Sequence, residues 1–274
     1  MQDNVSGYVH AYDGHESARL RYQAATLEAL LHSDISYPDG SKVLEAGCGV
    51  GAQSIPLARN SPGARITSVD ISAASLAEAS ARTEAAGVGN VAFVQADILD
   101  LPFAAESFDN IFVCFTLEHL PRPFEALCAL KPLLRAGGTI TVIEGDHGSA
   151  RFHPESDAAT SAIGALVELQ RAAGGDPDIG RRLYPLMNAA GYSRVRVSPR
   201  LVYVDGGRPD LAEGFTRRTF AAMVEGVRDA AVEAGLIELD QFEEGLRALD
   251  RAAQADGVFC YTFFKAVAER DPVS

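Results

Sequence analysis

The chain of 274 residues is long enough for one large domain or two small ones, and it can bury a core without disulfides or metals. Its 47% hydrophobic and 22% charged residues are typical of a folded globular protein, and no apolar run reaches the 18 or so residues of a membrane span. The net charge of −13 argues against a nucleic-acid partner, because phosphate binding needs a basic face. The four cysteines lack disulfide or zinc spacing and the first residues lack a signal-peptide pattern, so we expect a cytoplasmic protein.

The first half of the chain alternates between short apolar strands and helices. In chain order we predict a helix over 15–32, a strand over 42–46, a strand over 64–70, a helix over 73–86, strands over 91–97 and 107–115, a helix over 123–134 and a strand over 138–144. Such alternation is typical of βαβ units, so we predict a parallel sheet between residues 40 and 145.

The second half breaks this rhythm. There we predict helices over 155–173 and 178–190, a strand over 193–205, helices over 209–234 and 239–254, and a closing strand over 257–268. Two helical insertions, 148–175 and 206–256, should therefore form a cap over one edge of the sheet. We divide the chain into an N-terminal lid and helix (1–37), a ligand-binding core (38–147), and a cap with the last strands (148–274).

A glycine-rich turn, EAGCGVGA at 45–52, follows the first strand. Gly47, Gly49 and Gly51 allow a tight turn whose backbone N–H groups can approach a ligand. The same residues also satisfy the dinucleotide pattern G-x-G-x-x-G/A, so an NAD-dependent dehydrogenase is one alternative. Glu45 favours a ligand with a free amino group, because a carboxylate there would repel a dinucleotide phosphate.

Two acidic residues close the next strands. Asp70 can accept hydrogen bonds from the two hydroxyls of a ribose. Asp97 can accept a bond from the exocyclic amine of adenine, and Ile98 can offer a backbone N–H to the ring. Because the carboxyl ends of parallel strands lie at one edge of a sheet, we expect these groups and the glycine turn to form one ligand site.

These motifs together resemble those of the class I S-adenosylmethionine-dependent methyltransferases. The resemblance is carried by EAGCGVG, Asp70, Asp97, DNIFVCFTLEHL at 109–120 and LRAGG at 134–138, where Ala136 replaces the family's usual proline. It implies S-adenosylmethionine as cofactor and a Rossmann-like sheet of seven strands with helical cap insertions, in which the last strand runs antiparallel between two neighbours. It places the methionine part of the cofactor against Glu45 and the backbone at Gly47 and Phe115, the ribose at Asp70 and the adenine at Asp97 and Ile98, and it adds Cys48, Gly49 and Ile71 to the cofactor site.

The N-terminal stretch YVHAYDGHESARLRYQ is similar to that of a subgroup of archaeal and actinobacterial small-molecule methyltransferases. This subgroup includes enzymes that methylate prenylated indole alkaloids of the teleocidin type, among them a C-methyltransferase. The resemblance implies a hydrophobic acceptor from secondary metabolism, with carbon as one candidate atom.

The acceptor side is predicted from fewer residues. A base is needed only where the acceptor must lose a proton, and His147, after the fifth strand, is the candidate. O- or N-methylation of a small metabolite with His147 as base is therefore the alternative reaction. Tyr12, Tyr184 and Tyr203 are the candidate acceptor-binding residues, because aromatic side chains suit a hydrophobic ligand and can stabilise a cation. No set of His, Cys, Asp and Glu has metal-ligand spacing, so we expect no metal.

Residues 1–14 carry Tyr8 and Tyr12 and too few apolar residues to fold alone. We expect them to close over the occupied cofactor site as a lid, and to allow a homo-oligomer by reaching a neighbouring subunit. A non-catalytic or regulatory module of the same fold is the last alternative, and the presence of Glu45, Asp70 and Asp97 disfavours it.

Overall fold

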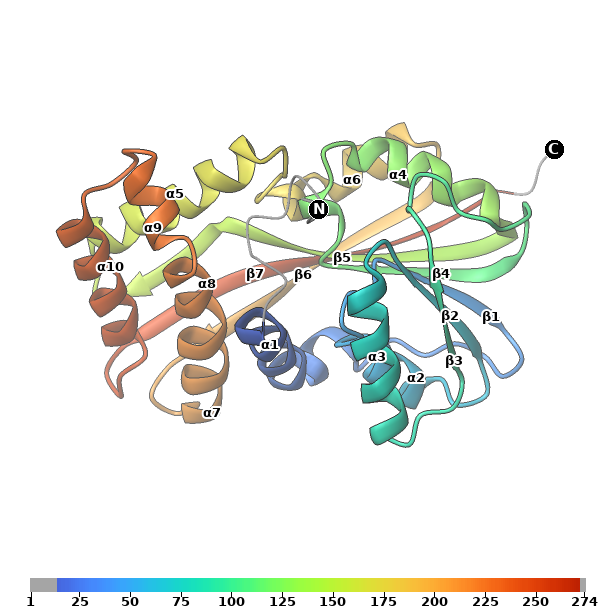
Figure 1. The fold of residues 1–274 in the computed structure, drawn as a ribbon, viewed down its shortest axis with the longest axis horizontal. Coiled ribbons are helices and arrows are strands. Elements are labelled where there is room, and N and C mark those ends of the chain that lie inside the picture. The colour runs from blue at the N-terminus through green and yellow to red at the C-terminus, as the bar shows by residue number, and fades with distance from the viewer. Residues whose placement is uncertain (1–13, 272–274) are drawn as a thin grey trace.

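The computed structural model describes residues 14–271. One seven-stranded sheet extends along the long axis of the molecule (Figure 1). Its strands are β1 Lys42–Ala46, β2 Arg65–Asp70, β3 Val91–Gln95, β4 Phe108–Cys114, β5 Leu134–His153, β6 Ser193–Val204 and β7 Val258–Glu269. They lie in the order β3-β2-β1-β4-β5-β7-β6. Strands β1 to β5 pair in parallel, whereas β7 is antiparallel to both β5 and β6. The predicted Rossmann-like sheet with an antiparallel closing strand is confirmed.

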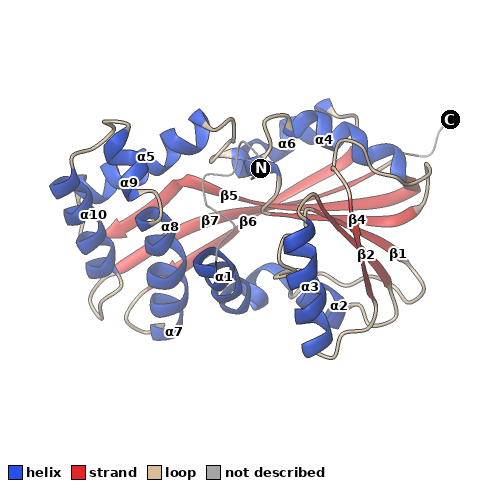
Figure 2. Ribbon diagram, viewed as in Figure 1, coloured by secondary structure: helices blue, strands red, loops and turns tan. Residues whose placement is uncertain are grey.

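Helices cover the sheet on both sides (Figure 2). They are α1 Gly14–His32, α2 Ser54–Asn60, α3 Ala73–Ala85, α4 Pro123–Leu130, α5 Asp157–Ala172, α6 Leu183–Ala189, α7 Pro209–Leu211, α8 Ala222–Glu225, α9 Arg228–Glu233 and α10 Leu239–Ala252, with a π-helix over Ala212–Ala221 between α7 and α8. None of the helices between residues 14 and 271 combines the length and apolarity that crossing a membrane requires.

The strands bury apolar side chains on both faces, as a sheet covered by helices on two sides requires. Successive residues alternate between two hydrophobic clusters: Val43 and Phe112 face α1 and α2, whereas Leu44 and Ile111 face α4 and α6. Leu27 and Leu31 of α1 belong to the first cluster. This packing holds the carboxyl ends of β1, β2 and β4 in a fixed arrangement.

Strand β5 is much longer than the predicted 138–144. It continues to His153 because β7 remains beside it, with Phe152 opposite Phe259 after an irregularity that follows Asp146. His147 therefore lies within β5, and its predicted place after that strand is wrong. The division of the chain at residue 147 falls inside this strand.

The two insertions pack as helices over the extended ends of β5 and β7, at the left of Figure 1. The predicted helix over 209–234 is broken into shorter pieces. Gly214 lies so close to α1 that a methyl group there would be 2.4 Å from Oγ1 of Thr26, and the Thr219 hydroxyl donates a hydrogen bond to the Gly214 carbonyl. This close contact accompanies the π-helix. The helical segments end again at Gly226, before α9 begins at Arg228.

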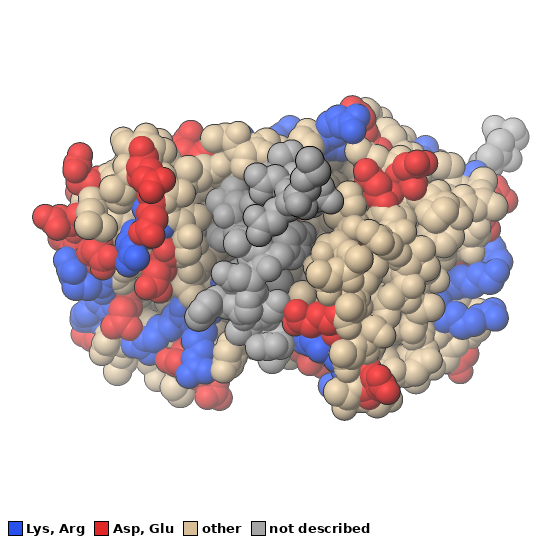
Figure 3. Space-filling view, viewed as in Figure 1, with Lys and Arg blue, Asp and Glu red and all other residues tan. Residues whose placement is uncertain are grey.

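On the face in Figure 3, acidic and basic side chains are interspersed over the cap helices.

The predicted lid lies outside the described residues apart from Gly14, and so do Tyr8 and Tyr12. The lid and its contact with a second subunit stay predictions.

Candidate active site

The glycine turn after β1 leaves no room for side chains at two of its positions. Gly47 has φ +79°, and a methyl group on it would lie 2.3 Å from Cγ2 of Thr116. Gly51 has φ +72°, and a methyl group there would lie 2.8 Å from Cβ of Ala79 in α3. Gly49, at φ +50°, instead faces open space. The turn can therefore bring its backbone against a ligand.

Asp70, at the end of β2, is bound to this turn. Its Oδ2 accepts a hydrogen bond from the Gly49 N–H at 2.8 Å, and its Oδ1 accepts one from the Ser72 N–H at 2.9 Å. Burial raises the pKa of Asp70, and the two N–H donors partly oppose that shift. Each carboxylate oxygen keeps a second lone pair, so both can still accept a bond from a ribose hydroxyl.

Glu45 is buried near the end of β1 and is not part of the cavity wall. Its buried Oε2 accepts hydrogen bonds from the Ser54 and Ser68 hydroxyls at 2.6 and 2.5 Å. Burial raises the pKa of this carboxyl, and the two hydroxyls oppose the shift. Its direct contact with a cofactor amino group stays a prediction.

The ends of β3 and β4 complete this edge of the sheet. Asp97 is exposed and holds the Leu99 N–H at 2.8 Å, next to the buried Ile98. Phe115 has φ +53°, a conformation that is costly for a bulky residue, and its N–H donates to the Ile143 carbonyl at 2.9 Å. Such strain persists where the surrounding structure enforces it, and it turns Phe115 towards the cavity.

One cavity brings most of the predicted cofactor residues together. Its wall includes Gly47, Cys48, Gly49, Asp70, Ile71, Asp97, Ile98 and Phe115. The predicted cofactor residue outside this wall is Glu45. Arg19 and Gln23 of α1 also line the cavity, and the sequence patterns gave no sign of their part in it.

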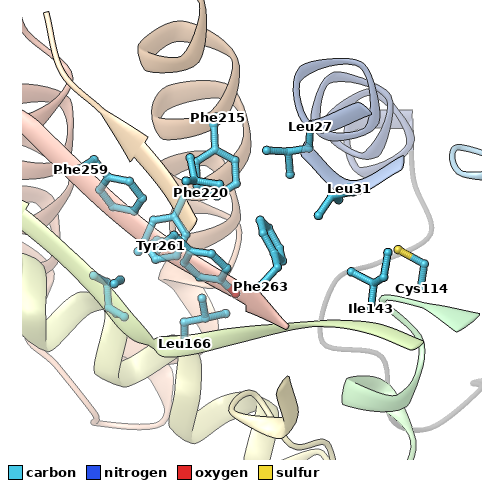
Figure 4. Close-up of a cluster of buried hydrophobic side chains, with 14 of the residues drawn as sticks. Leu27, Leu31, Cys114, Ile143, Leu166, Phe215, Phe220, Phe259, Tyr261 and Phe263 are labelled. Carbon is cyan, nitrogen blue, oxygen red and sulfur yellow. The ribbon is translucent and has the colours of Figure 1, made fainter. Parts of the chain in front are cut away.

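Another part of the same cavity wall is aromatic. Phe215, Phe220, Tyr261 and Phe263 line it, and we call these four residues the aromatic wall. Figure 4 shows them gathered between the π-helix and β7. Their ring centroids lie 5.5 Å apart for Phe220 and Tyr261, and 4.7 Å apart for Tyr261 and Phe263. Period-two alternation in the closing strand could have indicated that Tyr261 and Phe263 share a face.

His147 reaches this aromatic end from β5. Its side chain lines the cavity, and the residue is 5% exposed. Nδ1 lies 2.8 Å from the Tyr261 hydroxyl oxygen, and Nε2 lies 3.9 Å from Oε2 of Glu118. The arrangement places an imidazole, a phenol and a carboxylate beside one apolar space.

Glu118 is positioned by a buried carboxylate of β5. Glu144 accepts hydrogen bonds from the Thr116 and Leu117 N–H groups at 3.1 and 2.8 Å, which fixes the 3-10 turn Leu117–His119. Burial, and next the charge of Glu118, raise the pKa of Glu144 well above its ordinary value. No sequence pattern indicated this structural role of Glu144.

Two predicted acceptor-binding residues do not belong to the site. Tyr184 is 56% exposed, because α6 turns Leu183 and Met187 towards the core instead. Tyr203 is 37% exposed on the edge strand β6, with the Arg208 guanidinium 5.8 Å from its ring centroid. Neither lines the cavity, so the structure does not bring either residue to the site. Tyr12 lies outside the described residues.

The fold and the site match those of the class I S-adenosylmethionine-dependent methyltransferases: a glycine turn follows β1, carboxylates lie at the next strand ends, and an antiparallel β7 lies between β5 and β6. Comparison with known proteins agrees, because residues 43–138 match the family described as "Methyltransferase domain". In this domain and in its fold the chain resembles the class I methyltransferases, and its cofactor is S-adenosylmethionine. The dehydrogenase alternative is therefore set aside.

Individual relatives match parts of the chain. It is 28% identical to the O-methyltransferase resE of Aspergillus sclerotiorum, over 64% of this chain and 70% of that protein. It is 34% identical to the ubiquinone/menaquinone biosynthesis C-methyltransferase UbiE of Paracoccus denitrificans, over 39% and 43%. The matches span less than half the length of several other curated relatives.

A similar fold occurs in a putative methyltransferase from Bacillus halodurans. The structures superpose with a TM-score of 0.58 at 16% identity, over 90% of this chain and 100% of that one. At this level of identity the likeness concerns the fold.

The residues of the cavity fit this cofactor. Asp70 has lone pairs for two ribose hydroxyls, and the open space in front of Gly49 admits a ligand against the backbone. Arg19 is the one lysine or arginine on the wall among residues 14–271, and its charge suits the carboxylate of an amino-acid group.

Proposed function

We propose that this protein transfers the methyl group of S-adenosylmethionine to a hydrophobic small molecule, a natural product, bound against the aromatic wall. The observation that carries the proposal is that one cavity connects the glycine turn and Asp70 with Phe220 and Tyr261. A methyl donor held at the first end would face an apolar acceptor at the second.

The cofactor supplies an already activated methyl group when bound, so the chain mainly has to align the acceptor and exclude water. Asp70 and Asp97 would hold the ribose and the adenine, Glu45 with the backbone at Gly47 and Phe115 the methionine part, and Arg19 its carboxylate. The aromatic wall would orient the acceptor and keep water away from it. The contact with Tyr261 fixes the side chain of His147, a polar group of the cavity wall.

Two kinds of acceptor atom remain candidates. Aromatic faces stabilise a developing cation, which supports methylation at carbon. His147 lies beside Glu118, which supports an O- or N-methylation that uses His147 as base. The relatives described above include both an O-methyltransferase and a C-methyltransferase.

Comparing the turnover of two variants tests the proposal. His147→Ala should lower turnover about 10²–10⁴-fold if His147 is the base. Phe220→Ala should be the more damaging change if the aromatic wall orients the acceptor or stabilises a cation. The exposed Tyr184→Ala is the matched control and should leave turnover unchanged.

The assay should offer matched hydrophobic and polar acceptors with the methyl donor. Methylation of polar acceptors alone, with the Phe220→Ala variant as active as the unaltered protein, would contradict the hydrophobic-acceptor proposal.

A further inference from the structure

The Tyr261 hydroxyl contacts both the backbone N–H of Asp146 and the ring of His147, an arrangement that the function proposed above does not by itself require. Its oxygen accepts a hydrogen bond from the Asp146 N–H at 3.0 Å and lies 2.8 Å from Nδ1 of His147. The residue is 2% exposed. A methyl group on Gly145 would lie 2.5 Å from this oxygen, so the glycine creates the space that the hydroxyl occupies.

A phenol has a single proton to donate, and a buried donor needs an acceptor. Among the residues that the structure describes, Nδ1 of His147 is the acceptor within hydrogen-bonding distance of this hydroxyl. Burial, and next the charge of Glu118, raise the pKa of Tyr261 well above its ordinary value, so the phenol keeps its proton. If Nδ1 carried a proton instead, the buried phenol would lose that acceptor.

We propose that Tyr261 donates to Nδ1 and thereby holds neutral His147 in the tautomer with its proton on Nε2. His147 then offers an N–H donor on the side of Glu118, so in this state it recognises the acceptor molecule through an oxygen atom and does not serve as the base of the alternative reaction. Tyr261 acts as a positioning residue. The inference deepens the proposed function and rests on it, because it names the acceptor class: a hydrophobic molecule with a hydroxyl, enol or carbonyl oxygen.

The local charges are consistent with this tautomer. Glu118 lies 3.9 Å from Nε2, so its carboxylate attracts a proton on that nitrogen. The other nearby carboxylate, Asp146, is engaged by the Arg181 guanidinium, with 2.8 Å between Nε and Oδ2. The aromatic wall supplies apolar surface, so an N–H donor within it discriminates between ligands with and without an oxygen acceptor.

The tautomer can be read directly by ¹⁵N NMR of histidine-labelled protein at a pH at which the ring is neutral. His147→Gln assigns the signals. We expect Nε2 of His147 to show the shift of a protonated ring nitrogen and Nδ1 that of a hydrogen-bonded, unprotonated one. A proton on Nδ1, or rapid averaging of both tautomers, overturns the proposal.

Two phenylalanine variants separate positioning from packing. Tyr261→Phe should move the ¹⁵N chemical shift of Nδ1 to that of an unprotonated ring nitrogen that accepts no hydrogen bond. Tyr192→Phe is the matched control, since it removes another buried hydroxyl, which donates to the Leu127 carbonyl at 2.9 Å. Unchanged His147 signals in Tyr261→Phe, or equal changes in both variants, contradict the assignment.

Ligand recognition is tested with 2-naphthol and naphthalene, added to the protein saturated with S-adenosylhomocysteine. We expect about a tenfold preference for the naphthol, the effect of one hydrogen bond, and its loss in His147→Ala. If the two compounds bind with equal affinity, or if neither binds, the proposal that His147 recognises an oxygen atom is overturned. Failure of S-adenosylhomocysteine to bind would instead refute the proposed function, while the tautomer measurement would still stand.

Discussion

At the scale of single residues, Asp70 has two tasks. Its carboxylate holds the Gly49 and Ser72 N–H groups, and it also faces the cavity. A substitution there removes a ligand contact and an anchor of the glycine turn together. The effect on cofactor affinity should therefore exceed that at Asp97, which is exposed and holds the Leu99 N–H.

We predict that Asp70→Ala lowers the affinity for S-adenosylhomocysteine at least tenfold while the fold survives. Each lost hydrogen bond to a charged acceptor costs about 1.5–3 kcal/mol, and about 1.4 kcal/mol corresponds to a factor of ten. Calorimetric titration measures the affinity, circular dichroism checks the fold, and Asp97→Ala should show the smaller loss. An affinity equal to that of the unaltered protein would refute the ribose assignment.

A second residue-scale prediction compares two glycines of one turn. Gly49→Ala should cost about 1–2 kcal/mol, because a left-handed conformation is unfavourable for alanine even in open space. Gly47→Ala should cost more, since its methyl group also overlaps Thr116. Thermal unfolding of both variants checks the order, and equal midpoints would contradict the contact with Thr116.

At the scale of elements, the carboxylate of β5 that fixes the turn Leu117–His119 makes stability depend on pH. Because the pKa of Glu144 is raised on folding from about 4.5, the folded state keeps a proton that the unfolded chain has lost. Above about pH 4.5 the unfolding free energy should then fall as pH rises, until the pKa of the folded state is passed. One such group contributes at most about 1.4 kcal/mol per pH unit.

We predict that Glu144→Gln makes this decline between pH 5 and 8 shallower. The amide oxygen can still accept the Thr116 and Leu117 N–H bonds, but it has no charge to lose or gain. Urea unfolding at several pH values measures the slope, with the exposed Glu125→Gln as control. Part of the decline should remain, because burial also raises the pKa of Glu45 and Asp70. A slope identical to that of the unaltered protein would show that Glu144 is not the group responsible.

Elements with a local signal were predictable and those decided by distant contacts were not. The glycine turn and the strand ends at Asp70 and Asp97 carry their pattern within a few residues. The extension of β5 to His153 depends on pairing with β7, a hundred residues further along the chain. The π-helix lies where Gly214 contacts α1, which is likewise distant in the sequence.

The same distinction explains the two ends of the cavity. The cofactor residues follow consecutive strands, so the parallel topology brings them together. The aromatic wall instead combines a helix of the insertion with β7, and composition alone could not tell Phe220 from the exposed Tyr184 or Tyr203.

At the scale of the whole molecule, ligand binding should be visible as stabilisation. S-adenosylhomocysteine at 100 times its dissociation constant should add about 2.7 kcal/mol, which raises the melting midpoint of a chain of this size by about 5–10 °C. NAD is the matched control and should leave the midpoint unchanged. A shift with NAD alone would reverse the choice between the two nucleotide-binding classes.

The long strand β5 has a consequence for engineering. It carries Glu144 and His147 on the same continuous piece of sheet that pairs with β4 at the cofactor edge, whereas Phe215, Phe220 and Met223 come from the insertion 206–256. Part of the acceptor-facing wall is thus encoded separately from Glu144 and His147, while Tyr261 and Phe263 come from β7. A library confined to the insertion should change which molecules fit while the methyl-donor site and the imidazole stay in register.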